Sequence, residues 1–330
     1  MDQKTFVQLG QGRTRYIYEG DTSNSESPLI VCIHGIGSAS YSFQMLSEAL
    51  IKSGSVRILR LDLYGRGHSD AVSDPHTGEL FVDQVQELLE KLNLQNDKIT
   101  LIGHSMGGCI SALFTHKYPD KVERLILLTP AGLPWNLPTG SSLLKIPYLG
   151  RWVFGMLSSF VAPEKTVAEN FFDLEYSKDN IATLLKNRGE TEQSKWTDAL
   201  VNSVNNFPLT TSVEQITEIS RQERPTLIIW AEYDITTPSD ICFPQWVKLF
   251  KSNPKAEFVV VKDTRHNLHC EEVELSNQLI TSWVHGRDFK SMDLHKLRNT
   301  KSANVTLTAR DEIIKKFWLD NKVQYSAYMI

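Results

Sequence analysis

The sequence predicts an α/β protein in which helices cover both faces of a mostly parallel central sheet, with a helical cap insertion. Three observations support this prediction. Short runs of Val, Ile and Leu recur along the chain, segments with helical periodicity separate them, and the alternation stops once, over residues 133–220. Continuous apolar runs indicate strands that are covered on both faces, which is the condition of a parallel sheet between layers of helices.

Eight segments are predicted to be strands. Six are short runs of strand-forming residues, most of them continuously apolar rather than alternating, at residues 27–35, 56–65, 99–105, 122–130, 226–234 and 257–263. Two more, residues 5–10 and 14–20, alternate apolar and polar side chains around a glycine-containing turn. This alternation predicts an antiparallel hairpin at one edge of the sheet.

Helical periodicity fills several intervals between these runs. The predicted helices are residues 40–54, 80–93, 106–122 and 271–286. In the second of them, Val82, Val85 and Leu89 recur along one stripe, as one face of an amphipathic helix requires. Strand and helix therefore alternate over about 250 residues, which implies an α/β domain with right-handed crossovers.

The chain divides into three parts. Residues 1–132 and 221–286 are predicted to form the sheet domain. Residues 133–220 are predicted to form a helical cap over one end of the sheet, because an interval of this length without strands is too long for a loop. Large apolar residues occur throughout the insertion, at Leu143, Leu144, Trp152, Phe154, Phe160, Phe171, Phe172, Tyr176, Trp196 and Phe207. Most are expected to form a small core, and a few to line a pocket.

Residues 287–330 form the third part, a C-terminal tail. Thr308 with Asp311 predicts the start of an amphipathic helix. Its apolar face consists of Ile313, Ile314, Phe317 and Trp318. We expect this helix to dock on the body of the protein. Peripheral contact of the tail or the cap with a membrane is the second interpretation, which the mild positive charge of the tail keeps open.

The composition excludes several classes of protein. Hydrophobic residues make up 41% of the chain and charged residues 22%, which excludes general disorder, and the net charge of -4 gives no reason to expect a nucleic-acid partner. A cytoplasmic location is expected, because the sequence shows neither an apolar leader nor a run long enough to span a bilayer. No metal or organic cofactor is expected. The cysteines, which are expected to be buried thiols without metal-type spacing, are Cys32, Cys109, Cys242 and Cys270.

Ser105 lies between Gly103 and Gly107, where a predicted strand ends and a glycine-rich helix begins. A serine on a sharp turn between strand and helix projects its hydroxyl above the sheet edge, and flanking glycines let neighbouring backbone approach closely. Ligand sites of open α/β sheets also lie at the carboxyl ends of the strands. Ser105 is therefore the predicted nucleophile.

A serine hydroxyl needs a general base and an acidic partner to act as a nucleophile at neutral pH. Asp234 ends the run 226–234, and His266 follows the last predicted strand. Both would lie at the same sheet edge as Ser105. The order Ser, Asp, His along the chain is the one expected for this architecture, so these three residues form the predicted triad.

Other residues compete for two of these roles. His269 is the alternative to His266, but His266 comes first after the strand and leaves His269 to the helix that follows. Glu232 and Asp263 are alternatives to Asp234. We favour Asp234 because Glu232 lies within its strand and Asp263 lies nearer a strand end than a loop tip.

A tetrahedral oxyanion needs two hydrogen-bond donors. The backbone N–H of Met106, directly after the nucleophile, is predicted to be one of them. The backbone N–H of Ile36, in the loop after the strand at 27–35, is predicted to be the other. His34 is expected to brace this loop rather than to transfer protons.

The motifs around these residues resemble those of α/β-hydrolases of the serine esterase and lipase type, such as monoacylglycerol lipases. The motifs are HGIGS at 34–38, DLYGRGHSD at 62–70, GHSMGG at 103–108, WAEYD at 230–234 and RHNLHCEE at 265–272. The resemblance covers residues 15–285, with a divergent cap. It implies the α/β-hydrolase fold, and it implies that the second motif is a structural turn without a catalytic role.

The chain departs from the family pattern in the histidine loop. In such enzymes a glycine commonly precedes the catalytic histidine, and an acidic residue follows it five positions later. Here Arg265 replaces the glycine, whereas Glu271 keeps the spacing from His266. The spacing supports the choice of His266.

The resemblance implies acyl transfer to water through an acyl-enzyme. Hydrolysis of a carboxylic ester, with an apolar acyl group or a monoacylglycerol as substrate, is the first hypothesis because the cap is rich in aromatic residues. Hydrolysis of a carbon–carbon bond or a thioester on the same triad stays open, and so does a ligand-binding or signalling receptor on a hydrolase scaffold. A serine nucleophile argues against dehalogenase and epoxide-hydrolase chemistry, which use aspartate.

Overall fold

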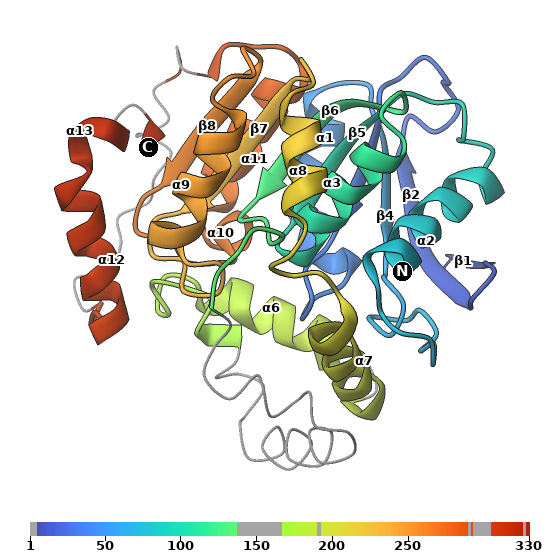
Figure 1. The fold of residues 1–330 in the computed structure, drawn as a ribbon. Helices are drawn as coiled ribbons and strands as arrows, with labels where there is room; N and C mark the ends of the chain where they lie inside the picture. Colours follow the sequence, from blue (N-terminus) through green and yellow to red (C-terminus); the bar gives the residue numbers. More distant parts are fainter. Residues whose placement is uncertain (1–4, 137–166, 190–192, 290–291, 293–304, 326–327) are drawn as a thin grey trace.

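The computed structural model describes residues 5–136, 167–189, 193–289, 292, 305–325 and 328–330. Within them, a sheet of eight strands runs through the middle of the molecule in the order β1-β2-β4-β3-β5-β6-β7-β8 (Figure 1). The strands are β1 (Thr5–Gln8), β2 (Arg13–Gly20), β3 (Leu29–Ile33), β4 (Arg57–Leu61), β5 (Ile99–His104), β6 (Val122–Leu128), β7 (Thr226–Ala231) and β8 (Ala256–Val261). Strands β3 to β8 pair in parallel, whereas β1 and β2 form an antiparallel hairpin at the edge. The mostly parallel sheet and its N-terminal hairpin are confirmed.

Helices cover both faces of the sheet, as predicted. The side chains of β3 alternate between two clusters: Leu29, Val31 and Ile33 pack into one, and Ile30 and Cys32 into the other. Because both faces are buried, the strand is apolar throughout. The first cluster includes residues of α2 (Gly78–Lys91), α3 (Met106–Lys117), α8 (Val213–Ser220) and α9 (Ser239–Phe250), and the second residues of α1 (Gln44–Ser53) and α11 (Val273–Val284). Short helices are η1 (Ser40–Phe43) and α10 (Leu268–Glu271).

Helix α9, between β7 and β8, is absent from the predicted helices. It carries Pro244 in its interior, a residue that ordinarily breaks a helix. Phe243, Trp246 and Phe250 are nevertheless buried in the first cluster, each at 1% exposure or less. Burial of these aromatic side chains therefore outweighs the local preference of proline.

The described part of the cap lies at the end of the sheet where Ser105 is found. Helices α6 (Lys178–Gly189) and α7 (Gln193–Asn206) lie below the sheet in Figure 1. The N–H of Gly132 donates to the carbonyl of Leu209 (2.7 Å), and the N–H of Ser212 donates to that of Gly132 (2.8 Å). The chain thus leaves and re-enters the sheet domain at neighbouring points.

Helix α8 follows this point of return and packs against α3 and α9, so it belongs to the layer of helices on the sheet. The predicted cap limits, residues 133 and 220, stay a prediction. Several residues of the predicted cap core lie outside the described part of the chain, and these are Leu143, Leu144, Trp152, Phe154 and Phe160.

The C-terminal tail docks on the body through α12 (Ala309–Asp320), which is followed by α13 (Lys322–Tyr325). Thr308 caps α12 as predicted. Ile314 and Trp318 are buried, but Ile313 is 56% exposed. The buried face of α12 is therefore narrower than the apolar face predicted from the sequence. Beyond α13, Met329 bridges to Val260 in parallel, so the tail also pairs with the outer strand β8.

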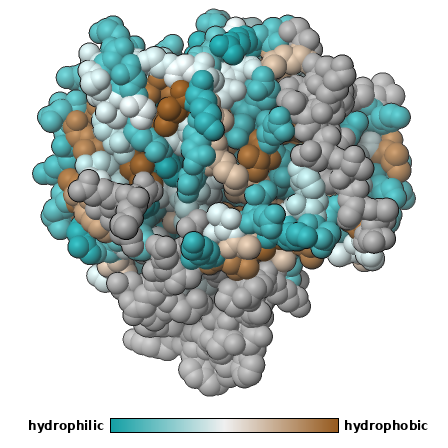
Figure 2. Space-filling model, turned by 180° about the vertical axis from the view of Figure 1, so that it is seen from behind, coloured by the Kyte–Doolittle hydropathy of each residue, from teal (hydrophilic) through white to brown (hydrophobic). Residues whose placement is uncertain are grey.

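The surface of the described residues is mixed in polarity. Figure 2 shows hydrophilic side chains over much of one face, with apolar side chains between them. Among the described residues, none of the helices is both long enough and apolar enough to span a bilayer. Membrane contact through the tail or the cap, and a cytoplasmic location, stay predictions. The large apolar side chains that are exposed are Ile51, Leu174, Val213, Ile241, Ile313 and Leu319.

Candidate active site

Ser105 occupies a strained turn between β5 and α3. Its backbone has φ 56° and ψ -120°, a conformation that costs a residue with a side chain of order 1–3 kcal/mol. The N–H of Ser105 donates to the carbonyl of Leu128 (2.9 Å), and its carbonyl accepts from the N–H of Ala131 (3.0 Å). These bonds to β6 and the residues after it hold the turn in place.

The two flanking glycines are required by close backbone contacts. A Cβ atom on Gly107 would lie 2.1 Å from the carbonyl oxygen of Ile33, and one on Gly103 would lie 2.3 Å from that of Gly107. Such distances are far below van der Waals contact. The G-x-S-x-G pattern therefore lets α3 start close to β3 and β5, and the predicted strand-to-helix turn at Ser105 is present.

Asp234 and His266 meet directly. The Nδ1 atom of His266 lies 2.8 Å from Oδ2 of Asp234, and the aspartate is fully buried. The carboxylate also accepts hydrogen bonds from the N–H of Thr236 (2.8 Å) and from the N–H (3.0 Å) and hydroxyl (2.9 Å) of Thr237. Because Nδ1 donates to a carboxylate, a neutral His266 ring carries its lone pair on Nε2, as a general base must.

The alternative base, His269, and the alternative acids, Glu232 and Asp263, do not form a pair like that of His266 and Asp234. His269 is buried with its ring stacked on Phe43, and neither of its ring nitrogens has a hydrogen-bond partner among the described residues. Burial, and then the charge of His266, lowers the pKa of His269 to about 3. Glu232 accepts a hydrogen bond from the backbone N–H of Asp263 (2.9 Å). The structure thus brings together the predicted pair and not the alternatives.

His104 contacts His266, a role that the sequence analysis did not predict. Its Nε2 lies 2.9 Å from the carbonyl oxygen of His266, and its ring packs between those of His266 (4.8 Å) and His269 (4.6 Å). Burial holds the pKa of His104 well below its usual value, so the ring is neutral and donates through Nε2. The only sequence signal for this role is its position before Ser105.

The loop that carries Ile36 lies against the turn of Ser105. A Cβ on Gly35 would lie 3.2 Å from Cβ of Ser105. His34 braces the loop, as predicted: its Nε2 accepts from the N–H of Leu63 (3.0 Å), so its Nδ1 donates to the carbonyl of Gly35 (2.8 Å). Burial is the main cause that lowers the pKa of His34 to about 4, which keeps the ring neutral.

The two predicted oxyanion donors, Met106 and Ile36, belong to segments that adjoin Ser105. Met106 is the first residue of α3, so its N–H lies in the helical turn that has no acceptor within the helix. Ile36 and Ser105 line one pocket. The roles of Met106 and Ile36 as donors stay predictions.

Arg66 ties this loop to the cap, and it too was missed in the sequence. The residue is 1% exposed, and its guanidinium donates to the carbonyls of Ile36 (3.1 Å) and Ala199 (3.1 Å) and to the hydroxyl of Ser203 (2.8 Å). Burial lowers its pKa to about 9. Arg66 lies in the DLYGRGHSD motif, so this structural turn connects the loop of Ile36 with helix α7.

Glu271 joins the histidine loop to the cap on the other side. This buried carboxylate accepts from the backbone N–H of Arg265 (3.0 Å) through one oxygen. The other oxygen accepts from the N–H groups of Phe172 (2.9 Å) and Asp173 (3.0 Å), which lie before α6. The spacing between His266 and Glu271 therefore has a structural reason, because the acidic residue closes the loop that presents the histidine.

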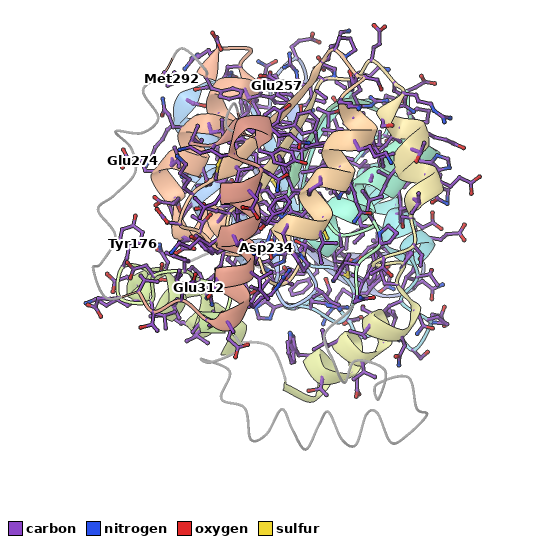
Figure 3. The ribbon with its side chains drawn as sticks, turned by 60° about the vertical axis from the view of Figure 1, so that its left-hand side comes forward. Tyr176, Asp234, Glu257, Glu274, Met292 and Glu312 are labelled. Atoms are coloured by element: carbon purple, nitrogen blue, oxygen red, sulfur yellow. The ribbon has the colours of Figure 1, made fainter. Side chains whose placement is uncertain are left out.

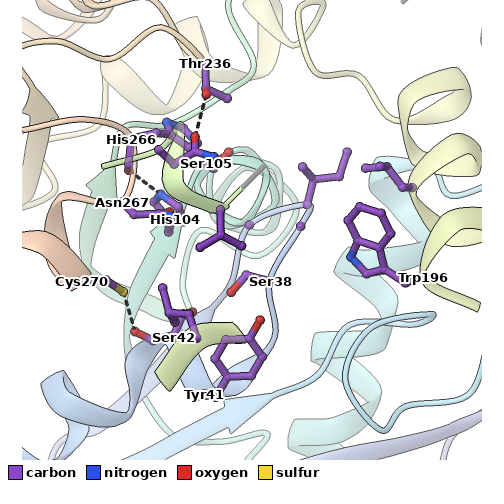
Figure 4. Close-up of a pocket in the computed structure, with 17 residues that line it drawn as sticks. Ser38, Tyr41, Ser42, His104, Ser105, Trp196, Thr236, His266, Asn267 and Cys270 are labelled. Atoms are coloured by element: carbon purple, nitrogen blue, oxygen red, sulfur yellow. Dashed lines mark hydrogen bonds between the residues drawn. The ribbon is translucent and has the colours of Figure 1, made fainter. Parts of the chain in front are cut away.

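The pocket above Ser105 has a volume of about 200 Å³. Ser105 and His266 line it together, and Figure 4 shows Thr236, Tyr41 and Trp196 around the same space. Among the described lining residues there is no Lys, Arg, Asp or Glu, so this part of the pocket suits an uncharged group. The cap supplies the lining residues Val167, Asn170, Leu184, Trp196 and Leu200.

Thr237 is expected to matter for catalysis because its hydroxyl helps to hold Asp234. Thr237→Val should lower kcat roughly 10-fold with little change in KM, since a hydrogen bond to a charged group is worth about 1.5 kcal/mol or more. Thr236→Val is the matched control, because the hydroxyl of Thr236 donates to Asn170 (2.9 Å) instead. It should change KM more than kcat in steady-state assays. Equal kcat values for the two variants would contradict this role of Thr237.

Comparison with known proteins agrees with the observed architecture. A family model described as "alpha/beta hydrolase fold" matches residues 28–273. The 2-hydroxy-6-oxononadienedioate/2-hydroxy-6-oxononatrienedioate hydrolase of Klebsiella pneumoniae subsp. pneumoniae is 26% identical over 285 residues, which cover 83% of this chain and 92% of that protein.

Two solved structures have the same fold. The enol-lactonase from Burkholderia xenovorans LB400 matches with a TM-score of 0.67 at 18% identity, over 85% of this chain and 100% of that one. A thermophilic esterase from Thermogutta terrifontis matches with a TM-score of 0.64 at 21% identity, over 86% and 98% of the two chains. At these identities the likeness shows the fold alone.

Proposed function

Since this chain belongs to the α/β-hydrolase fold family, we propose that it is a serine hydrolase that cleaves a carboxylic ester with an uncharged, apolar acyl group. The observation that carries this proposal is the buried Asp234–His266 pair, which lies in one site with Ser105 on its strained turn. A nucleophile, a base and an oriented acid at one pocket are the parts that acyl transfer needs.

In the proposed reaction, Nε2 of His266 takes the proton of Ser105 as the serine oxygen attacks the ester carbonyl. Asp234 stabilises the imidazolium that forms. The N–H groups of Met106 and Ile36 stabilise the oxyanion of the tetrahedral intermediate. The intermediate collapses as His266 returns the proton to the leaving alcohol, and water activated by His266 then releases the acid from the acyl-enzyme.

Hydrolysis of a carbon–carbon bond is the second candidate, and the name of the Klebsiella relative favours it. That name specifies a dioate, which carries two carboxylates. A dicarboxylate is held best by cationic side chains, and the described lining of this pocket has no Lys or Arg. We therefore place the ester first.

A panel of substrates tests the proposal with the full-length protein. We expect turnover of uncharged aryl esters, with kcat/KM highest for short acyl chains, because about 200 Å³ is below the roughly 300–1,000 Å³ of pockets for drug-sized ligands. A monoacylglycerol and an oxo-dienedioate extend the panel to the alternatives. Turnover of the oxo-dienedioate but of no ester would contradict the proposal. Covalent labelling by a fluorophosphonate without turnover of any substrate would favour the receptor hypothesis.

A further inference from the structure

We propose that Asp311, in the C-terminal helix α12, is a positioning residue for the proposed base His266 and acts on it through Arg265. The inference rests on the proposed function, because it concerns the loop that presents His266. Asp311 lies 45 positions beyond that residue, in a part of the chain that the family model, which ends at residue 273, does not cover. The tail helix is then a component of the catalytic apparatus rather than an appendage.

The contact itself is short and shielded from solvent. Nη2 of Arg265 lies 2.5 Å from Oδ2 of Asp311, and the two side chains are 11% and 0% exposed. A charged hydrogen bond at this depth is little screened by water or salt. Because Arg265 is joined to His266 by a peptide bond, fixing its side chain restricts the backbone that orients the imidazole ring.

Arg265 is held at both ends. Its backbone N–H donates to Glu271 (3.0 Å), and its side chain reaches Asp311 on the opposite side. A glycine at position 265, which the family pattern has, cannot make the second contact. In this chain, the arginine that departs from the pattern therefore contacts a helix that lies beyond the residues matched by the family model.

Asp311 is also held by hydrogen bonds at the start of its own helix. Its Oδ2 accepts from the N–H (2.8 Å) and the hydroxyl (2.7 Å) of Thr308, and its own N–H donates back to that hydroxyl (3.2 Å). This capping box fixes the aspartate at the first turn of α12. A carboxylate with this many donors is a fixed point against which Arg265 can be held.

Helix α12 is docked independently of this contact. Arg310 pairs with Asp240 of α9 (2.5 Å), and the indole N–H of Trp318 donates to the carbonyl of Glu232 (3.0 Å). In Figure 3, Glu312 marks the helix, which lies along the side of the sheet domain, and Asp234 marks the site. The Arg310–Asp240 pair thus joins the same helix to the same body without touching the histidine loop.

These two ion pairs supply a matched test in the full chain. Asp311→Asn removes the charge but keeps an oxygen that can accept from Thr308, and Asp240→Asn makes the same change in the docking pair. We expect Asp311→Asn to lower kcat about 10-fold with KM within twofold, and to lower the rate of labelling by a fluorophosphonate in parallel. Asp240→Asn should lose thermal stability and keep both rates. The acidic limb of the pH profile of labelling should move to lower pH only in Asp311→Asn, because a misaligned ring is less stabilised by Asp234.

A double-mutant cycle completes the test. Arg265→Gln should slow labelling at least as much as Asp311→Asn, because it also removes the hydrogen bond from Nη1 of Arg265 to the carbonyl of Glu169 (3.4 Å). The double variant should be no slower than Arg265→Gln alone, because both substitutions break the contact between Arg265 and Asp311. Equal effects of Asp311→Asn and Asp240→Asn would overturn the inference while the proposed function stands. Additive effects of Asp311→Asn and Arg265→Gln would do the same. A wild-type protein that neither labels nor hydrolyses any ester would overturn the proposed function, and this inference with it.

Discussion

Ser105→Ala is expected to lower kcat for the best ester by roughly 10⁴-fold or more, as loss of a serine nucleophile does in other triads. The reason is that no acyl-enzyme can form without the serine oxygen. Covalent labelling by a fluorophosphonate should disappear as well. Intact-mass spectrometry of the labelled protein and steady-state assays measure the two effects.

The control for this variant is a buried serine outside the pocket. Ser220→Ala removes a hydroxyl that donates to the carbonyl of Thr217 (2.7 Å) at the end of α8, so labelling should be unchanged. Ser105→Gly adds a second readout, because glycine accepts φ 56° without strain. It should unfold at a higher denaturant concentration than Ser105→Ala, because its free energy of unfolding should be larger by about 1 kcal/mol. Labelling that persists in Ser105→Ala would show that another residue is the nucleophile.

His266→Ala should reduce kcat by a similar factor, on the order of 10⁴, because it removes the group that accepts the proton from Ser105. His269→Phe should keep most of the activity, since phenylalanine retains a flat ring against Phe43. Steady-state assays of the two variants at pH 7 distinguish the two histidines. If His269→Phe were inactive and His266→Ala active, the choice of base would be wrong.

The variant His269→Phe also tests the effect of burial on stability. The pKa of His269 in the folded protein is about 3, below the ordinary value of 6.5. The unfolded chain therefore binds a proton that the folded chain does not, so stability is lost as pH falls from about 6.5 toward 3. His269→Phe should lose less stability than wild type between pH 7 and pH 4.5 in urea unfolding. An identical loss in both proteins would show that His269 does not drive the acid sensitivity.

The parts of the fold that depend on local pattern were predictable from the sequence. Most of the buried strands are continuous apolar runs because both faces of each strand are covered, and the N-terminal hairpin alternates because it lies at an edge. Helix α9 was not predictable, because Pro244 opposes the helix and only the burial of its aromatic residues explains it. Ile313 was likewise predicted to lie on the buried face of α12 because it is apolar, but the docked helix exposes it to solvent.

In the candidate site, too, some residues were predictable from the sequence and others were not. Ser105, Asp234 and His266 could be proposed because each follows a strand, and parallel strands end at one edge of the sheet. The residues that support them were missed, because their roles depend on contacts between segments far apart in the chain. Arg66 contacts helix α7, and Asp311, in the C-terminal tail, contacts Arg265 in the histidine loop. Spacing along the sequence carries no signal of such contacts.

The pairing of the tail with β8 has a consequence for solubility. An outer strand presents unpaired N–H and carbonyl groups, which can recruit a strand from another molecule and start aggregation. Here the N–H of Ile330 donates to the carbonyl of Val260 (2.9 Å), and the N–H of Lys262 donates to that of Ile330 (2.9 Å). The tail thus occupies part of the edge at which a second molecule could add, while the opposite edge is formed by the short strand β1. Protection against edge-to-edge association is therefore built into the same segment that carries Asp311.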